Sequence, residues 1–254
     1  MPKIDLNCDM GEGFGAYKIG DDEAMLGLVT TANIACGFHA GDPVVMRKTI
    51  LTAKSKGVAI GAHPSFMDLY GFGRRRISGE RPEDLEAQLV YQIAAIKGMA
   101  EALGWPITHV KTHGSLNNMS AEDPELAAVC VRAAKSIDPL LVFVALPYSE
   151  MTKAAEAAGL PSVCEVFADR TYTDRGTLTP RSIEGAVIHD PARSVDQVLS
   201  MVCDGLIPTT GGRKLPVDAG TLCVHGDTPG AVALAGALRT ALVEHGVEIV
   251  RFAA

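Results

Sequence analysis

Short apolar runs alternate with longer segments of helical periodicity along the whole chain. Runs of this length that are rich in β-branched residues are typical of strands buried on both faces. Seven such strands are predicted: Lys3–Cys8, Val29–Ile34, Val58–Gly61, Thr108–Lys111, Leu141–Ala145, Val163–Val166 and Thr221–Val224. Strands that alternate with helices pair in parallel through right-handed crossovers. The pattern therefore predicts an α/β fold, with the strands arranged in a closed or nearly closed (β/α) barrel.

Several helices have recognisable ends. Asp42-Pro43 offers a side-chain acceptor at the N-cap and proline at the first helical position, and Gly57 can end that helix. The longest helix begins near Pro82 and carries one apolar stripe until Gly104. Further helix starts are predicted at two capping boxes, Ser120-x-x-Asp123 and Ser194-x-x-Gln197, and at Thr228-Pro229, from which a helix runs to Gly246.

The length and punctuation of the chain predict one domain. Single α/β barrels commonly occupy about 250 residues, and this chain has 254. No Gly/Ser-rich linker, charge run or internal repeat divides it. We expect a single barrel over residues 1–254, with an irregular, turn-rich insertion around residues 169–214 that adds a loop or a small hairpin and one weak helix. Residues 247–250 fit either a last strand or an edge strand.

Composition excludes several classes of protein. The chain has 23 Lys and Arg against 30 Asp and Glu, a formal net charge of −7, whereas a nucleic-acid footprint requires a basic face. No apolar run approaches the roughly 20 residues of a membrane span, and no signal peptide is visible. We expect a cytoplasmic protein without nucleic-acid or membrane partners. Its six cysteines contain no CxxC pair and are expected to be buried free thiols.

Polar residues follow the predicted strands at their carboxyl ends, where barrels build their sites. Asp5, Asn7 and Asp9 alternate along the first strand, so they share one side of it, and three aligned polar residues favour a site in the barrel interior. Asn33 ends the second strand. His39 lies on the following glycine-flanked loop, ahead of a helix for which Asp42 already provides the cap.

The third strand leads into His63, which the adjacent Pro64 holds with little backbone freedom. A Gly-x-Gly sequence and three arginines, Arg74–Arg76, then follow. This segment fits either a mobile loop that carries an anion clamp or a solvated surface loop.

The fourth strand carries the most informative residue, Lys111. A lysine inside a barrel strand is costly unless it pairs with an acid or acts on a substrate. His113 shares its strand face by the two-residue period. His109 is interpreted as out of phase with Lys111 and is expected to be structural, as are His189 and His245.

The last part of the chain supplies further candidates. Glu165 ends a strand and is followed by Asp169 and Arg170, and either acid is able to pair with an arginine simply to hold the loop. The final strand delivers His225, while Asp227 competes with Thr228 for the cap of the next helix.

Two chemistries remain open for these convergent groups. They suit a divalent metal that activates water, with Asp9, His39 and His63 as candidate ligands, although HxxxH and HExxH spacings are absent. They equally suit general acid–base catalysis by Asp and His, with Lys111 stabilising an oxyanion. No P-loop, dinucleotide fingerprint or nucleophile elbow is present.

At these residues the sequence resembles the LamB/YcsF family along essentially its whole length. The resemblance rests on several long ordered motifs: Asp5–Glu12, Asn33–Pro43, Gly61–Arg75, Val110–Asn117, Phe167–Arg170 with Pro180-Arg181, and Val224–Pro229. It implies a distorted seven-stranded (β/α) barrel similar to the glycoside hydrolase/deacetylase group, in which carbohydrate deacetylases use an Asp/His/His metal site. It also implies cleavage of the 5-oxo-L-proline lactam to L-glutamate with ATP as co-substrate, in a complex with B and C subunits.

The combined interpretation divides the candidate residues by role. Catalytic roles are predicted for Asp9, His39, Lys111 and His113. Substrate contacts are predicted for Asn7, Asn33, His63, Arg74, Glu165, Arg170, His225 and Asp227. Two alternatives are kept: a metal-dependent amidase or deacetylase that acts on N-acyl sugars without ATP, and a non-catalytic subunit that binds lactam or carbohydrate.

Overall fold

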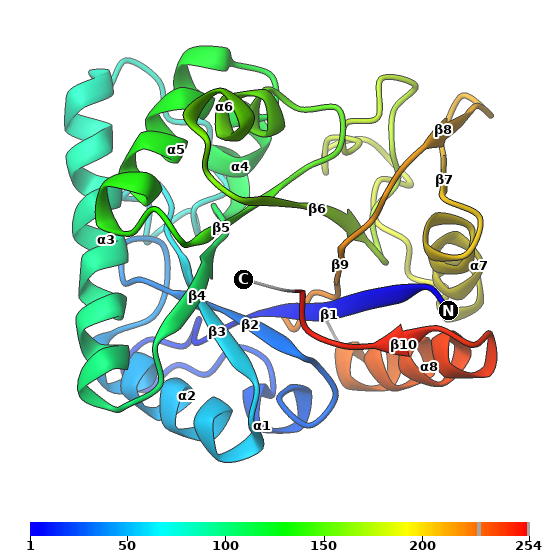
Figure 1. Ribbon diagram of the computed structural model, residues 1–254, viewed down its shortest axis with the longest axis horizontal. Helices are drawn as coiled ribbons and strands as arrows, with labels where there is room; N and C mark the ends of the chain where they lie inside the picture. Colours follow the sequence, from blue (N-terminus) through cyan, green and yellow to red (C-terminus); the bar gives the residue numbers. More distant parts are fainter. Residues whose placement is uncertain (228–229, 253–254) are drawn as a thin grey trace.

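The computed structural model, which describes residues 1–227 and 230–252, contains a closed parallel barrel (Figure 1). Its seven strands are β1 (Lys3–Met10), β2 (Thr31–Ala35), β3 (Ala59–His63), β4 (Ile107–Val110), β5 (Val142–Ala145), β6 (Ser162–Phe167) and β9 (Thr221–Cys223). Each strand pairs in parallel with the next, and pairing of β9 with both β6 and β1 closes the ring. The predicted seven-stranded barrel is confirmed, and the strand boundaries differ from the prediction by only one or two residues.

Helices surround the barrel on its outer side (Figure 1). They are α1 (Asp22–Met25), α2 (Pro43–Lys56), α3 (Pro82–Ala102), α4 (Gly114–Ser120), α5 (Pro124–Ile137), α6 (Glu150–Ala158), α7 (Pro191–Val202) and α8 (Ala231–Glu244). Helix α2 has the predicted ends: the Asp42 side chain accepts hydrogen bonds from two backbone N–H groups, and Gly57 ends the helix in the left-handed conformation.

The two predicted capping boxes are wrong. Ser120 is the last residue of α4, and Ser194 lies inside α7, so neither caps a helix. The N-caps of α5 and α7 are instead Asp123 and Asp190, each followed by proline. The Asp123 side chain accepts hydrogen bonds from two backbone N–H groups, and the Asp190 side chain accepts one. An Asp-Pro pair combines the cap with a preformed first helical residue, which a Ser-x-x-acid pattern lacks.

The predicted helix start at Thr228-Pro229 lies outside the described residues. Within the described part, α8 begins at Ala231 after the N-cap Gly230. It ends at Glu244, two residues before the predicted stop at Gly246, which takes up a left-handed conformation beyond the helix end.

The segment around residues 169–214, for which a loop or a small hairpin and one weak helix are expected, contains a longer helix and leads into an antiparallel strand pair. Helix α7 is 12 residues long. Strands β7 (Leu206–Pro208) and β8 (Lys214–Pro216) form an antiparallel pair outside the barrel. The last strand, β10 (Glu248–Ile249), pairs with the first residues of β1 as an edge strand. Beyond it the Phe252 ring packs edge-on against His109 at a centroid distance of 5.3 Å.

The barrel interior is polar rather than filled with branched aliphatic side chains. At its amino-terminal end the Asp5 carboxylate accepts hydrogen bonds from the hydroxyls of Thr30, Thr31 and Thr221. One layer higher, the Asn7 side chain donates to Thr221 and Glu165. The predicted alternation along β1 is therefore correct, and the interior polar groups satisfy one another as burial requires.

The cysteines and the surface agree only in part with expectation. All six cysteines are free, but Cys203 is exposed and Cys164 is half-buried, so the prediction of burial is wrong for these two.

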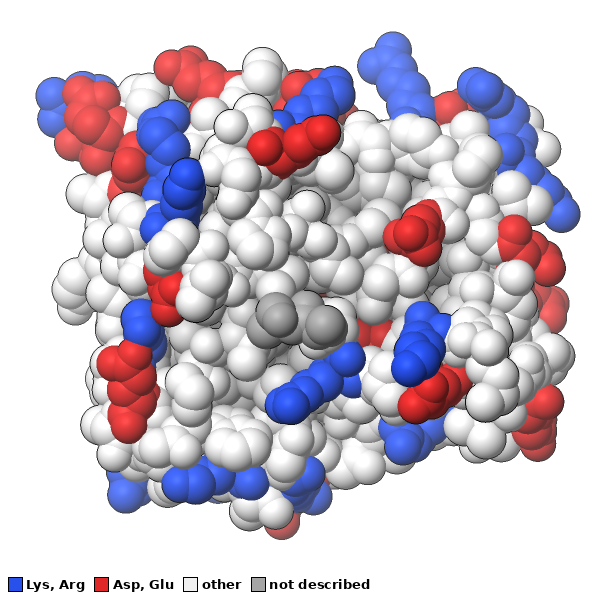
Figure 2. Space-filling view, viewed as in Figure 1, with Lys and Arg blue, Asp and Glu red and all other residues white. Residues whose placement is uncertain are grey.

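None of the described helices is long and apolar enough to cross a membrane. Figure 2 shows acidic and basic side chains interspersed on the face of the molecule that is viewed in Figure 1.

Burial of Asp5 predicts a measurable dependence of stability on pH. Burial raises the pKa of Asp5 from 3.8 to about 6, against the opposing hydrogen bonds of the threonines. The folded state therefore binds the extra proton between these values, and stability falls as pH rises through this window. Relative to Asp5→Asn, the wild-type chain is expected to lose about 2 kcal/mol of unfolding free energy between pH 4 and pH 7. Urea denaturation of both proteins across this range measures the difference, and parallel stability profiles contradict the prediction.

Candidate active site

A cavity of about 550 Å³ opens at the carboxyl ends of the barrel strands. Its lining includes Asp9, His63, Lys111, His113, Arg181 and His225. These residues come from β1, β3, the ends of β4 and β9, and the segment after β6, so residues distant in sequence meet at one rim. This is the position at which (β/α) barrels bind their ligands.

The Lys111 ammonium group occupies the floor of the cavity. Its Nζ lies 3.0 Å from Asp9 Oδ1 and 2.7 Å from Glu165 Oε1. It also donates to Cys223 Sγ at 3.2 Å, and it lies 5.2 Å from the centre of the Phe167 ring. The three N–H donors of the ammonium group are already matched by these acceptors, which leaves little capacity to bind a ligand. Lys111 therefore chiefly holds the two carboxylates in place.

The same contacts fix the charges on the cavity floor. Burial lowers the pKa of Lys111, but Asp9, Cys223 and Glu165 outweigh that effect and raise it well above its usual value. Burial raises the pKa of Asp9, but His63 and Lys111 outweigh it and hold the pKa well below the usual range. Burial leaves Glu165 with a raised pKa despite the neighbouring Lys111. Lys111 and Asp9 are therefore both ionised at neutral pH.

A second pair joins His225, which lines the cavity, to the buried Asp169. His225 Nδ1 lies 2.8 Å from both carboxylate oxygens of Asp169. Because a carboxylate only accepts, Nδ1 carries the proton, and Nε2 of the neutral ring is left with its lone pair. An Arg181 guanidinium nitrogen lies 3.3 Å from that Nε2. This acid–histidine pair has the geometry of a general base whose ring is oriented by a carboxylate.

Arginines give the cavity wall a positive character. Arg74, Arg76, Arg170 and Arg181 all line the cavity. Burial and the charge of Arg74 lower the pKa of Arg181, while burial and Arg181 lower the pKa of Arg170 to about 10. Mutual repulsion of this kind is relieved when an anion binds between the guanidinium groups.

The arginines of the Gly-x-Gly loop divide between two roles. Arg74 lies 2.7 Å from the Asp227 carboxylate across the cavity mouth, and Arg76 lines the cavity. Arg75 instead pairs with the buried Asp68 of its own loop. The segment is therefore folded against the site through Arg75, and it presents its two other arginines to the cavity.

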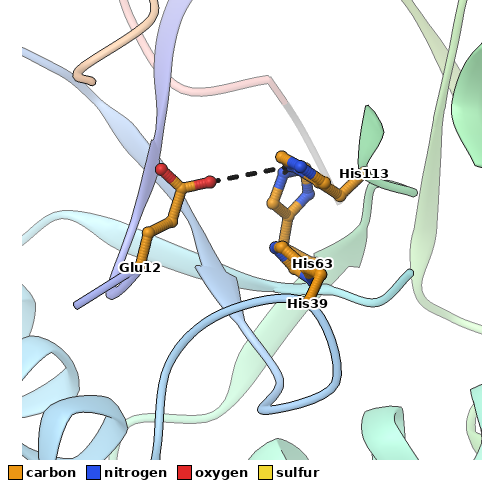
Figure 3. A group of neighbouring side chains, drawn as sticks. All are labelled: Glu12, His39, His63 and His113. Carbon is orange, nitrogen blue, oxygen red and sulfur yellow. Dashed lines mark hydrogen bonds and ion pairs between the residues drawn. The ribbon is translucent and has the colours of Figure 1, made fainter. Parts of the chain in front are cut away.

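A cluster of three imidazoles and one carboxylate adjoins the cavity (Figure 3). One ligand atom from each of Glu12, His39, His63 and His113 lies within 4.8 Å of the others, and all four residues are buried. Gly73 covers the cluster at a φ of +63°, and a Cβ there would lie 2.8 Å from His113 Cδ2 and 2.9 Å from His39 Cβ. The loop thus closes directly over the imidazoles.

The structure brings most of the predicted site residues together but gives them different positions. Of the predicted residues, those that line the cavity are Asp9, His63, Arg74, Lys111, His113, Arg170 and His225. Asn7, Asn33 and Glu165 lie beneath them in the interior network. His39 is fully buried outside the lining, and Asp227 pairs with Arg74.

Arg170 holds the insertion in place as well as lining the cavity. Its guanidinium donates to the backbone carbonyls of Thr179 and Ala186. The interpretation of a loop-holding pair between an arginine and Glu165 or Asp169 is wrong, because Glu165 pairs with Lys111 and Asp169 pairs with His225.

The placement of His109 out of phase with Lys111 is wrong. Residues two apart share a strand face, and the His109 ring lies in the barrel interior with Nε2 2.9 Å from Asn33 Oδ1. Its environment is structural: the ring is completely buried, Nδ1 faces Thr108 Oγ1, and its plane meets the Phe252 ring edge-on.

Sequence reasoning assigned no site role to three residues that the structure places in or beside the cavity. Glu12, Asp169 and Arg181 all lie within the family motifs, directly after β1 and in the segment after β6. Their polarity and their position after strands indicate that they belong to a site. The sequence does not indicate which residues they pair with, because each partner lies at the end of a different strand.

The fold and the cavity define a (β/α)-barrel protein whose site lies at the carboxyl ends of its strands. The chain belongs to the LamB/YcsF family, whose model matches residues 4–254. It is 50% identical over 254 residues to a 5-oxoprolinase A subunit of Brevibacillus brevis, covering 100% of both chains. It is 48% identical to a 5-oxoprolinase A subunit, the second so named, of Bradyrhizobium diazoefficiens, covering 99% of this chain and 98% of that one.

A solved structure has the same fold. The crystal structure of a lactam utilization protein from Thermus thermophilus superimposes with a TM-score of 0.93 at 42% sequence identity. The match covers 98% of this chain and 100% of that chain.

The ion pairs of Lys111 predict how its loss affects stability. Lys111→Met leaves two buried carboxylates without their ammonium partner, so the unfolding free energy is expected to fall by about 3–5 kcal/mol. Adding Glu165→Gln removes one of the stranded charges and should restore part of that loss. Chemical denaturation of the wild type, both single variants and the double variant gives the coupling energy. Additive effects of the two substitutions contradict the prediction.

Proposed function

We propose that this chain is the A subunit of an ATP-dependent 5-oxoprolinase, which opens the lactam ring of 5-oxo-L-proline to give L-glutamate. The observation that carries the proposal is the Asp169–His225 pair beside an arginine-lined cavity at the barrel rim. Full-length similarity to relatives named as 5-oxoprolinase A subunits supports the choice of substrate. The proposal includes partner subunits B and C, since an A subunit belongs to a larger assembly.

The chemistry of the lactam explains a requirement for ATP. A five-membered amide is stable and its nitrogen is a poor leaving group. Transfer of a phosphoryl group from ATP to the amide oxygen makes the ring carbon open to attack by water. The C–N bond then breaks as the nitrogen takes up a proton, and an acyl phosphate remains. A second water hydrolyses that acyl phosphate, which releases phosphate and leaves the side-chain carboxylate of L-glutamate.

In this proposal His225 takes the proton from the attacking water. Its Nε2 carries the lone pair, because Asp169 holds the proton on Nδ1. An Arg181 guanidinium nitrogen lies 3.3 Å from that Nε2, so in this proposal Arg181 turns to an anionic group of the substrate before water reaches the lone pair. Burial raises the pKa of Asp169, but His225 and Arg181 outweigh it and keep the pKa below the usual range. The carboxylate therefore stays charged and stabilises the imidazolium that forms. This role differs from the substrate contact that the sequence predicts for His225.

The arginines suit the anionic groups of the reaction. The substrate carries one carboxylate, and the activated ring carries a phosphoryl group, so two anions must be held at once. Arg74 lies on the loop after β3 and Arg181 in the segment after β6, and both line the cavity, so their guanidinium groups are available to bind the two anions. Lys111 holds Asp9 ionised beneath them.

Substitution of His225 tests the assignment of the base. In the assembled complex, His225→Gln is expected to lower kcat by about 10²–10⁴-fold, because the proton acceptor is lost. Asp169→Asn should act in the same direction through the tautomer of His225. His189→Gln, at an exposed histidine, is the matched control and should leave turnover unchanged. Glutamate formation and phosphate release measure the effect, and turnover of the His225 variant equal to that of the control refutes the assignment.

The two alternative functions make different predictions for the same preparations. A metal-dependent amidase or deacetylase would release acetate from N-acyl sugars without ATP, and a chelator would stop it. A purely binding subunit would retain turnover in the complex after His225→Gln and change only substrate affinity. We expect instead that glutamate forms only with ATP and both partner subunits present. Lactam cleavage by the isolated chain contradicts this expectation.

A further inference from the structure

The hydrogen bonds of His63 and His113 fix the tautomers of both rings. His63 Nδ1 lies 2.7 Å from the carbonyl oxygen of Lys111, and His113 Nε2 lies 3.0 Å from the carbonyl oxygen of Phe72. A carbonyl oxygen can only accept, so these two ring nitrogens must carry protons. In the neutral rings the lone pairs therefore reside on His63 Nε2 and His113 Nδ1.

These two lone pairs face each other. His63 Nε2 and His113 Nδ1 are 3.0 Å apart, a contact that two acceptors do not make without a cation or a proton between them. Two carboxyl groups lie beside the same point: Asp9 Oδ2 lies 3.1 Å from His63 Nε2, and Glu12 Oε1 lies 3.7 Å from His113 Nδ1. Figure 3 shows the Glu12 carboxylate aimed at this pair of rings.

His39 supplies an independent observation. Its ring is completely buried, and neither ring nitrogen has a hydrogen-bond partner among the described residues. The ring stacks on His113 at a centroid distance of 4.0 Å and meets His63 edge-on. An imidazole with two unpartnered nitrogens inside a protein is costly unless a ligand takes up at least one of them.

We propose that Glu12, His39, His63 and His113 form a binding site for a divalent transition metal of the Zn²⁺ type. Three imidazole nitrogens and one carboxylate oxygen are a donor set that such ions accept. The carbonyl groups of Lys111 and Phe72 act as the outer partners that orient ligating histidines. A single shared proton would satisfy only the contact between His63 and one neighbour, and it would leave His39 and Glu12 unexplained.

The site differs from the ligand set predicted from sequence, which combined Asp9 with His39 and His63. In the structure Asp9 groups with Cys223 and His225, while His39 and His63 group with Glu12 and His113. Asp9 is also engaged by Lys111 and Asn33, which compete with a metal for its Oδ1. Among the described residues, no lysine or arginine forms an ion pair with Glu12, whose Oε1 lies 3.7 Å from His113 Nδ1.

Metal binding is tested on the isolated, untagged chain, so the result does not depend on partners, ATP or turnover. After chelator treatment, Zn²⁺ is titrated by calorimetry and by competition with a chromophoric chelator. We expect one tight site per chain and a higher Tm on binding. His39→Ala should weaken binding by about 100-fold or more, since it removes a ligand without breaking any protein hydrogen bond. His189→Ala, at an exposed histidine, should bind as the wild type does.

Two further measurements separate the competing outcomes. Circular dichroism must show that the His39→Ala chain is folded, and Glu12→Gln provides a second variant that should also weaken binding. Co²⁺ is the spectroscopic probe: a site of nitrogen and oxygen ligands shows no thiolate charge-transfer absorption. Such absorption, with loss of binding in Cys223→Ser, would assign the metal to the other group and overturn the proposal, as would the absence of any binding.

The inference goes beyond the proposed function and does not depend on it. If the chain binds no metal and the complex still opens the lactam, only the metal site is refuted. If the chain binds Zn²⁺ and the complex has no lactam activity, only the proposed function is refuted.

Discussion

One buried ammonium group organises the interior of this barrel. Lys111 lies between Asp9 and Glu165, and without it two carboxylates would occupy the centre of the fold without a counter-charge. Only hydrogen bonds from amide and hydroxyl groups would then compensate the cost of desolvating the two carboxylates. Asn7 in turn donates a hydrogen bond to Glu165, and Asn33 donates one to Asp9. The orientation of these interior polar side chains therefore follows from the position of Lys111 Nζ.

The rim above this network has two differently built halves. On one side an acid–histidine pair and several arginines face an open cavity, an arrangement suited to anions and to proton transfer. On the other side three buried imidazoles lie beneath the loop that contains Gly73. Asp9 connects the halves, since its two carboxylate oxygens bond to Lys111 and to His63 respectively. A change of charge in either half therefore alters the electrostatic potential in the other half.

The sequence predicted the barrel well because the fold depends on local periodicity. Short buried strands, Asp-Pro helix starts and an alternating first strand all signal themselves within a few residues, and the structure has them. The capping boxes failed because an Asp-Pro pair lay close to each serine and formed the stronger start. The sequence also indicated which strand ends carry ionisable residues.

The pairing of those residues was beyond sequence reasoning. Asp169 and His225 are 56 residues apart, and Lys111 and Glu165 meet across the barrel, so their contacts depend on strand tilt and register rather than on local pattern. His109 is a different case, because the two-residue period of the strand already puts it on the same face as Lys111, inside the barrel.

The packing of Gly61 against His109 shows how far the demands of the site extend. A Cβ on Gly61 would overlap the His109 ring, which in turn holds the Asn33 amide that donates to Asp9. Because Gly61 on β3 has no Cβ, the His109 ring fits there and, through Asn33, helps to position the Asp9 carboxylate on β1. Gly61 is not part of the cavity lining, yet any larger side chain at this position would displace His109 and, through Asn33, the carboxylate of Asp9.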